Sequence, residues 1–275
     1  MSTEFMDAFS SVEHSDENFD LPPLREGMSK MELLDYMVLS VTRILSVQKA
    51  FKGGYMLNKL IKASSRQTSD IDFSISSKED YEEIKCVLKS IAEKFICYGY
   101  ISSYRIKETI EERMSGGIDL YNDTGEKVLG VDVGLHDIGW GITSYSFDVT
   151  TLDGFEIERM LADKLIAITS RKRFRRTKDL YDFFIITSSF DFSFDKLKEY
   201  VALRGGAEWE NIPFTDVVIR EYEKAWNKLR LIDIDGNNLD PIDFSKAVMR
   251  FYVIAVPCKD NKPLHHWDRL TQRLE

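Results

Sequence analysis

The feature that most limits the fold is a glycine pair followed by a helix and then by an Asp-Ile-Asp strand. A short apolar segment runs into Gly53-Gly54, and apolar residues then recur at helical spacing as far as Ile61. Asp70 and Asp72 alternate with apolar residues, which is the spacing of a strand. This order predicts an α/β unit in which a glycine turn brings backbone N–H groups close to a ligand.

The two aspartates indicate the kind of ligand. Residues two apart on a strand point to the same face, so Asp70 and Asp72 lie side by side and repel each other. A bound Mg²⁺ relieves this repulsion, because hard cations take carboxylate oxygens and bridge to phosphates. Each signal alone is weak, since a glycine pair is mostly a turn and Asp-x-Asp is more often a solvated strand edge. Together they predict phosphate chemistry with a metal ion.

The chain divides by composition into three parts. Residues 1–27 are polar and acidic and are expected to form a flexible arm or a clasp on the surface. Residues 28–153 mix helical and strand spacing, whereas residues 154–275 are largely helical in pattern. The predicted fold class is therefore α+β, with a mixed-sheet N-terminal half and a mainly helical C-terminal half.

Element ranges follow from the two periodicities. Helices are predicted over about 30–47, 56–61, 79–98, 155–170, 176–188, 194–203, 215–230 and 243–255. Strands are predicted over about 70–75, 104–114, 117–121, 128–135 and 145–151.

Composition excludes several classes of protein. With 43% hydrophobic and 12% aromatic residues, the chain of 275 residues is not disordered as a whole. Three cysteines without a pairing pattern favour a reducing compartment, and Cys86 and Cys97 are expected to be buried. The start lacks a signal pattern and no run is long enough to span a membrane, so a cytoplasmic protein is expected. The net charge of −9, taken alone, argues against nucleic acid as a partner.

The charge is not evenly spread, however. Six cations fall within the eight residues 171–178, namely Arg171, Lys172, Arg173, Arg175, Arg176 and Lys178. Clustered arginines suit phosphates, so this basic run predicts a local, salt-sensitive contact with a nucleic acid backbone. The alternative is a solvated turn between two helices.

Three segments together resemble a known family. The order apolar-Gly-Gly, helix and Arg-x-Thr-x-Asp-Ile-Asp, ending at Asp72, resembles the nucleotidyltransferase superfamily, and within it the AbiEii/AbiGii-type toxins. Residues 158–167 resemble the family's helix with its functional lysine, and residues 173–182 resemble its following Arg-Asp-Leu-Tyr-Asp-Leu segment. The resemblance covers roughly residues 48–190. One departure is Tyr55, where the family usually has a small hydroxyl residue.

The resemblance implies a polymerase-β-like nucleotidyltransferase half and a helical half, with the active site between them. It also implies Mg²⁺, a nucleoside triphosphate, and transfer of a nucleotide to an acceptor. The basic run favours RNA as that acceptor, and the family favours the tRNA 3′ end. The expected biological setting is a toxin–antitoxin or abortive-infection system, in which a cognate antitoxin protein neutralises the toxin.

Residue roles are carried over onto matching positions. The expected catalytic residues are Asp70, Asp72, Asp132, Lys164 and Asp182, of which Asp70, Asp72 and Asp132 are the metal ligands. The expected nucleotide-binding residues are Gly53, Gly54, Arg66, Ser69, Lys164, Arg171 and Asp179. The basic run, rather than the resemblance, gives the expected RNA-binding residues, which are Lys172, Arg173, Arg175 and Arg176. Asp119 is the alternative third carboxylate, and Asp132 is preferred because its β-type run is more continuous.

Two other functions stay open at this point. The same chemistry could modify a hydroxyl of a protein or of a small, aminoglycoside-like molecule. A degenerate member could instead bind nucleotides without turnover, although the presence of both Asp70 and Asp72 argues against it. The sequence does not identify the triphosphate, the acceptor, the oligomeric state or the role of the arm.

Overall fold

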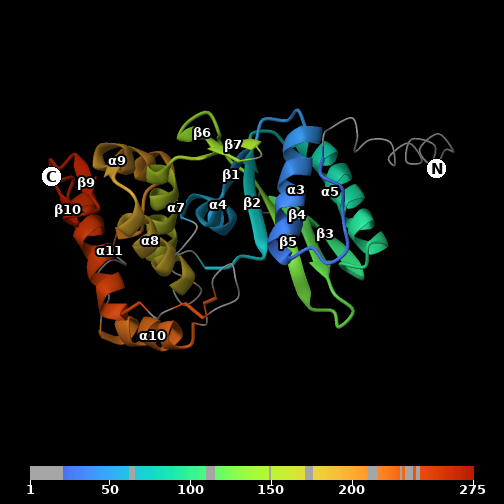
Figure 1. Ribbon diagram of the computed structural model, residues 1–275. Helices are drawn as coiled ribbons and strands as arrows, with labels where there is room; N and C mark the ends of the chain where they lie inside the picture. Colours follow the sequence, from blue (N-terminus) through green and yellow to red (C-terminus); the bar gives the residue numbers. More distant parts are fainter. Residues whose placement is uncertain are drawn as a thin grey trace. The chain divides into compact units, whose positions relative to one another are not determined.

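The structure is a computed structural model (Figure 1). It describes residues 21–61, 66–109, 115–148, 150–170, 176–209, 216–229, 231–232, 238–239 and 242–275. Contacts divide the chain into two compact units. The first unit comprises the residues up to Phe51 together with Ser69–Ile138 and Ser144–Asp153, and the second comprises Lys52–Thr68, Gly139–Thr143 and Gly154–Glu275. Residues 52–68 and 139–143 thus group with the C-terminal unit, whereas the expected ranges 28–153 and 154–275 are contiguous.

A seven-stranded mixed sheet forms the centre of the first unit, and the ends of some strands belong to the second. Its strands are β1 (Ala50–Lys52), β2 (Asp70–Ile75), β3 (Ser103–Thr109), β4 (Ser115–Tyr121), β5 (Lys127–Leu135), β6 (Ile142–Phe147) and β7 (Thr150–Phe155). Their order across the sheet is β3-β4-β5-β2-β1-β7-β6. Strand β2 runs parallel to β5, and β4 runs antiparallel to both β3 and β5. The predicted run 145–151 is wrong as a single strand, because a turn at Asp148 separates β6 from β7.

One face of the sheet is apolar and carries helices α3 (Lys30–Ile44) and α5 (Glu79–Cys97) (Figure 1). Ile71, Phe73 and Ile75 of β2 are almost fully buried, as their alternation with polar residues predicts. The hydroxyl of Tyr81, on α5, accepts a hydrogen bond from the backbone N–H of Gly117 on β4, 2.8 Å away. The opposite face of these strands is therefore left for the polar side chains.

The second unit is mainly helical. Its helices in the described part of the chain are α4 (Gly53–Ile61), α7 (Ile157–Thr169), α8 (Thr177–Ser189), α9 (Phe194–Leu203), α10 (Asp216–Asn227) and α11 (Phe244–Lys259). The side chains of Phe183, Phe194, Phe251 and Trp267 are fully buried and form part of its core. A three-stranded sheet joins β8 (Phe192–Ser193), β9 (His266–Asp268) and β10 (Arg273–Leu274) in the order β10-β9-β8.

The fold class predicted from the sequence is confirmed, because the structure has a mixed sheet with helices and a mainly helical C-terminal part. The small sheet was not predicted. Cys86 and Cys97 are exposed, so their predicted burial is wrong. Of the expected arm, residues 1–20 lie outside the described residues, and in its described end Leu21 and Leu24 are buried. Among the described helices, none combines the length and apolar character needed to cross a bilayer.

Candidate active site

The polar face of the large sheet carries two rows of residues that run across four strands. Residues paired in register point to the same face. The first row, from β3 to β2, is Arg105, Asp119, Gly130 and Asp70. The second row lies two residues from the first on each strand, and it comprises Lys107, Gly117, Asp132 and Asp72. Charged residues and glycines therefore occupy both rows, and the four carboxylates lie on three neighbouring strands.

Asp119 is the centre of the charge arrangement on this face. It is 5% exposed, and three cations contact its carboxylate. Nζ of Lys127 lies 2.8 Å and Nζ of Lys107 3.1 Å from Oδ1, and Nη2 of Arg105 donates to Oδ2 over 3.1 Å. These four residues, Asp119, Arg105, Lys107 and Lys127, are called the Asp119 cluster below.

The two lysines also connect this cluster to the expected metal ligands. Nζ of Lys107 lies 2.5 Å from Oδ1 of Asp132, and Nζ of Lys127 lies 2.6 Å from Oδ1 of Asp70. Lys30, at the start of α3, is a further cation near Asp70: burial lowers its pKa, and the Asp70 carboxylate opposes that shift. Lys107 and Lys127 therefore each bridge two carboxylates, which reduces the repulsion between neighbouring aspartates.

Two glycines make room for these lysines. A Cβ at Gly130 would lie 2.6 Å from Oδ1 of Asp70 and 2.7 Å from Nζ of Lys127. A Cβ at Gly117 would lie 3.2 Å from Cε of Lys107 and 1.9 Å from the carbonyl oxygen of Val131. The absence of side chains at these two positions lets the lysines lie across the strands.

Asp70, Asp72 and Asp132 have the chemistry that a divalent cation requires, because carboxylate oxygens are the preferred ligands of Mg²⁺. Asp72 pairs directly with Asp132 on the parallel neighbour β5, and Asp70 lies two residues away on the same face. Among the described residues, no group of three or more His, Cys, Asp or Glu is already gathered as a metal site. The donor set and its register fit the ion, while ammonium groups at present lie beside two of the carboxylates.

Of the two candidates for the third carboxylate, Asp132 has the better position. It lies beside Asp72 on the adjacent strand and its side chain is 49% exposed, so it is accessible to a ligand. Asp119 lies one strand further from β2 and is enclosed by cations. The assignment of Asp132 stays a prediction, and it is supported by this register.

The charge of Asp119 gives a pH prediction. Burial raises the pKa of Asp119, but Lys127, Arg105 and Lys107 lower it from 3.8 to about 2. A depressed pKa means that the ionised form stabilises the fold above about pH 4, by about 2 kcal/mol, and that this contribution is lost as the pH falls towards 2. We expect Asp119→Asn to lower the free energy of unfolding by about 2 kcal/mol at pH 7, and the difference from the wild type to shrink at lower pH. Urea denaturation at pH 7, 4 and 3 measures this.

A control for this prediction is Asp123→Asn, because Asp123 is exposed in the turn between β4 and β5. Its stability should follow that of the wild type at each pH. A difference between Asp119→Asn and the wild type that stays constant from pH 7 to pH 3 would contradict the argument.

The second unit contains the glycine turn. Gly53 follows the last residue of β1 with φ of +71°, a conformation that glycine adopts without strain, and it is the first residue of α4. A Cβ at Gly54 would lie 3.1 Å from Oγ1 of Thr68 and 3.7 Å from Nη1 of Arg66. Backbone N–H groups at the start of a helix attract anions, so this turn has the character of a phosphate-binding site.

Arg66 connects the glycine turn to a buried ion network. Its Nε and Nη2 donate to the two carboxylate oxygens of Asp182, each over 3.0 Å. Asp182 also accepts a hydrogen bond from Nζ of Lys164, 2.8 Å away, and Lys164 donates a second to Asp179 over 2.8 Å. Burial lowers the pKa of Lys164, but Asp182 and Asp179 raise it well above its ordinary value, so the ammonium stays charged. The structure thus brings Arg66, Lys164, Asp179 and Asp182 together.

Tyr55 occupies the position where the family usually has a small hydroxyl residue, but its buried hydroxyl does not take over the role of that residue. Its side chain is only 2% exposed within α4, and Nζ of Lys59 lies 5.6 Å from the centre of its ring. The phenol is therefore enclosed by protein.

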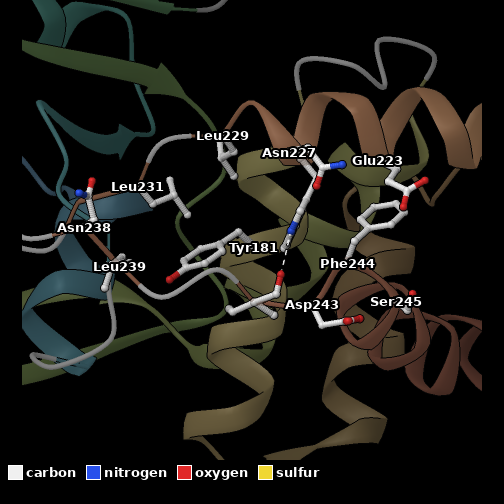
Figure 2. Close-up of a pocket in the computed structure, with 12 residues that line it drawn as sticks. Tyr181, Glu223, Asn227, Leu229, Leu231, Asn238, Leu239, Asp243, Phe244 and Ser245 are labelled. Carbon is white, nitrogen blue, oxygen red and sulfur yellow. Dashed lines mark hydrogen bonds between the residues drawn. The ribbon is translucent and has the colours of Figure 1, made fainter.

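A cavity of about 750 Å³ in the second unit is lined by Tyr181 (Figure 2). Tyr181 also lines a narrow crevice with Gly54, Arg66 and Asp182. Glu223, Asn227 and Asp243 line the larger cavity beside aromatic rings. Its carboxylates make it a poor site for a triphosphate, so the glycine turn and Lys164 are the better phosphate-binding candidates.

The remaining residues predicted for the site are described in part. The hydroxyl of Ser69 donates to Asp70 over 3.2 Å. Of the basic run, Arg176 and Lys178 are described, and Lys178 is exposed. The side chain of Arg176 is 40% exposed, and its Nη1 lies 3.5 Å from Asp179. The remaining RNA-binding and nucleotide-binding predictions in the run, Arg171, Lys172, Arg173 and Arg175, lie outside the described residues. Arg105, Lys107 and Lys127 were not predicted, because their importance depends on strand pairing.

Comparison with solved structures identifies the kind of fold. A candidate nucleotidyltransferase from H. pylori matches with a TM-score of 0.54 and 15% identity, over 86% of this chain and 97% of that one. JHP933 from Helicobacter pylori matches with a TM-score of 0.55 and 15% identity, over 87% and 94%. At this identity the likeness shows the fold alone, which is a nucleotidyltransferase-like fold.

The sequence identifies the family. The model of the AbiEii nucleotidyl transferase toxins of type IV toxin–antitoxin systems matches residues 41–247. The chain therefore belongs to the AbiEii toxin family, as the resemblance of its motifs predicted. Membership supports a nucleotidyl-transfer activity and implies a nucleoside triphosphate as substrate and an antitoxin as partner. A search of curated proteins finds no match.

Proposed function

We propose that the chain is an Mg²⁺-dependent toxin that transfers a nucleotide from a nucleoside triphosphate to RNA, with the 3′ end of tRNA as the acceptor. The observation that carries the proposal is the pairing of Asp72 with Asp132 on adjacent parallel strands, beside Asp70 on the same face. Three carboxylates so arranged suit a divalent ion bound to a triphosphate. Arg176, a member of the basic run whose side chain is 40% exposed, supports RNA as the acceptor.

Each group of residues has a separate task. Asp70, Asp72 and Asp132 would hold the ion, which would neutralise phosphate charge and lower the pKa of the acceptor hydroxyl. The backbone N–H groups of Gly53 and Gly54 hold phosphate oxygens at the start of α4. Lys164 and Arg66, with Asp182 and Asp179 as positioning residues, place positive charge near the phosphates.

The reaction is a substitution at the α-phosphorus. The oxygen of the acceptor hydroxyl forms the new bond to the α-phosphorus, and the bond from that phosphorus to the oxygen bridging to the β-phosphate breaks. The hydroxyl proton is lost to solvent, and pyrophosphate leaves with the bonding electron pair. In a toxin whose acceptor is tRNA, the modified end no longer accepts an amino acid, the setting is the cytoplasm, and a cognate antitoxin blocks the activity.

Asp70→Ala is the first test of this function. We expect it to abolish transfer of label from any of the four α-labelled nucleoside triphosphates to total RNA. Because Lys127 keeps its contact with Asp119 in this variant, the thermal unfolding midpoint should change little. Transfer is measured in separate pools of RNA, protein and aminoglycoside, so that the class of acceptor is identified in the same experiment.

Asp123→Asn is the matched control, because it removes a carboxylate of the same unit that is exposed in the turn between β4 and β5 and is a member of neither row. It should transfer label like the wild type. Persistent transfer by Asp70→Ala would overturn the metal assignment. Label that enters only the protein or the aminoglycoside pool would overturn the RNA acceptor.

A further inference from the structure

The Asp119 cluster has a surplus of positive charge around one buried carboxylate. Arg105, Lys107 and Lys127 all contact Asp119, which carries a single negative charge. Three cations on one carboxylate leave a local surplus of two. A buried carboxylate that orders three cations at the edge of a polar sheet face is a built arrangement and differs from a scatter of surface lysines.

Two carboxylates that the proposed function assigns to the metal ion compensate part of this positive charge. Lys107 also contacts Asp132, and Lys127 also contacts Asp70. If Asp70, Asp72 and Asp132 hold a divalent ion, that ion meets two of their three negative charges in place of the lysines. Asp119 and the one remaining carboxylate charge then face three cations, so a net positive charge of about one is left and the cluster becomes attractive to an anion.

Arg105 is the member of the cluster that a ligand can reach most easily. Its side chain is 69% exposed, compared with 21% for Lys107 and 35% for Lys127. Asp119 anchors one end of its guanidinium through Nη2, and the guanidinium carbon lies 5.9 Å from the centre of the Tyr121 ring. An anchored guanidinium presents its other N–H groups to a phosphate with less loss of side-chain freedom.

Strand order indicates which phosphate this is. Gly53 follows β1, which lies on one side of β2, whereas the cluster lies on β3, β4 and β5 on the other side. Nucleotide transfer brings two phosphate-bearing molecules to the carboxylates, and the glycine turn has the character of the triphosphate site. We propose that the Asp119 cluster binds a backbone phosphate of the acceptor RNA strand, with Arg105 as the main contact. This inference rests on the proposed function.

The test is Arg105→Gln, which removes the guanidinium and leaves Asp119 paired with two lysines. We expect the KM for acceptor RNA to rise about tenfold at saturating triphosphate, while the KM for the triphosphate stays unchanged. In fluorescence anisotropy with the same RNA and Mg²⁺, the slope of log K against log salt should decrease in magnitude by about one. A thermal unfolding curve establishes that the variant is folded.

Lys78→Gln is the matched control. Lys78 is exposed beside the start of α5 in the same unit, and its substitution removes one positive charge away from the polar face. Both KM values and the salt slope should equal those of the wild type. An effect of the same size in Lys78→Gln would show that general surface charge, and not the cluster, attracts RNA.

Two further outcomes would overturn the inference. If Arg105→Gln raises the KM for the triphosphate and leaves the KM for RNA unchanged, the cluster belongs to the nucleotide. If RNA affinity and salt slope both stay at wild-type values, the cluster binds no acceptor phosphate. Failure of the proposed function is recognised separately, because the wild type would then transfer no label to RNA before any variant is compared.

Discussion

Replacing Asp182 by asparagine is expected to lower the free energy of unfolding by about 3 kcal/mol and the rate of nucleotide transfer about a hundredfold. Asp182 is 3% exposed and is the shared partner of Arg66 and Lys164. Removing one member of a buried ion network leaves the others without compensation, which costs about 3–5 kcal/mol. The lower end of this range applies because Lys164 keeps Asp179 as a partner.

The loss of activity has a separate cause. An asparagine has one carbonyl oxygen in place of two carboxylate oxygens, so it cannot accept both hydrogen bonds of the Arg66 guanidinium and that of Lys164. A displacement of charged groups by about 1 Å can cost a factor of about a hundred in rate. The pKa of Asp182 leads to the same conclusion: burial raises it, but Lys164 and Arg66 hold it below its ordinary value, so the native network requires the ionised form.

Urea denaturation and the labelled transfer reaction test this pair of effects. Asp260→Asn is the control, because Asp260 is an exposed carboxylate at the end of α11 in the same unit. It should match the wild type in both measurements. A folded Asp182→Asn variant with wild-type stability and transfer would show that the network has no part in either.

Much of the fold follows from local periodicity. The helix predicted over 79–98 is α5, which runs from Glu79 to Cys97, and the helix predicted over 194–203 is α9. These segments alternate between buried and exposed positions at helical spacing, so their pattern is sufficient. The small sheet could not be predicted in this way, because strands as short as Phe192–Ser193 have no measurable alternation. The predicted burial of Cys86 and Cys97 was wrong for a different reason, because both residues lie on the exposed side of an amphipathic helix.

The candidate site was only partly predictable for a related reason. Asp70 and Asp72 could be identified because their relation is local, two residues apart on a single strand. The cations around Asp119 could not, because strand pairing decides which residues from β3, β4 and β5 become neighbours. Arg66 and Asp182 are 116 residues apart, so their hydrogen bonds are a property of the tertiary fold alone. The family resemblance identified both residues but not their contact.

Gly117→Ala is expected to be the most damaging single-methyl substitution on the polar sheet face, lowering the free energy of unfolding by about 3 kcal/mol or more. Gly117 has φ of +133°, and a Cβ there would lie 1.9 Å from the carbonyl oxygen of Val131. Because that oxygen belongs to the neighbouring strand, it cannot move aside as the end of a side chain could. The variant therefore has to separate β4 from β5 at the level of Asp132.

Gly125→Ala is the reference for an alanine at a positive φ that meets no neighbouring atom. Gly125 also has a positive φ, of +75°, but a Cβ there meets nothing within 4 Å. Its substitution should cost about 1 kcal/mol, the price of the backbone conformation alone. Urea denaturation of both variants, with transfer measured where the protein is folded, gives by difference the cost of the contact together with the greater backbone strain at φ of +133°. If the two alanines prove equally destabilising, the close approach of Gly117 to β5 has no energetic weight, and the register that places Asp132 beside Asp72 would lose this support.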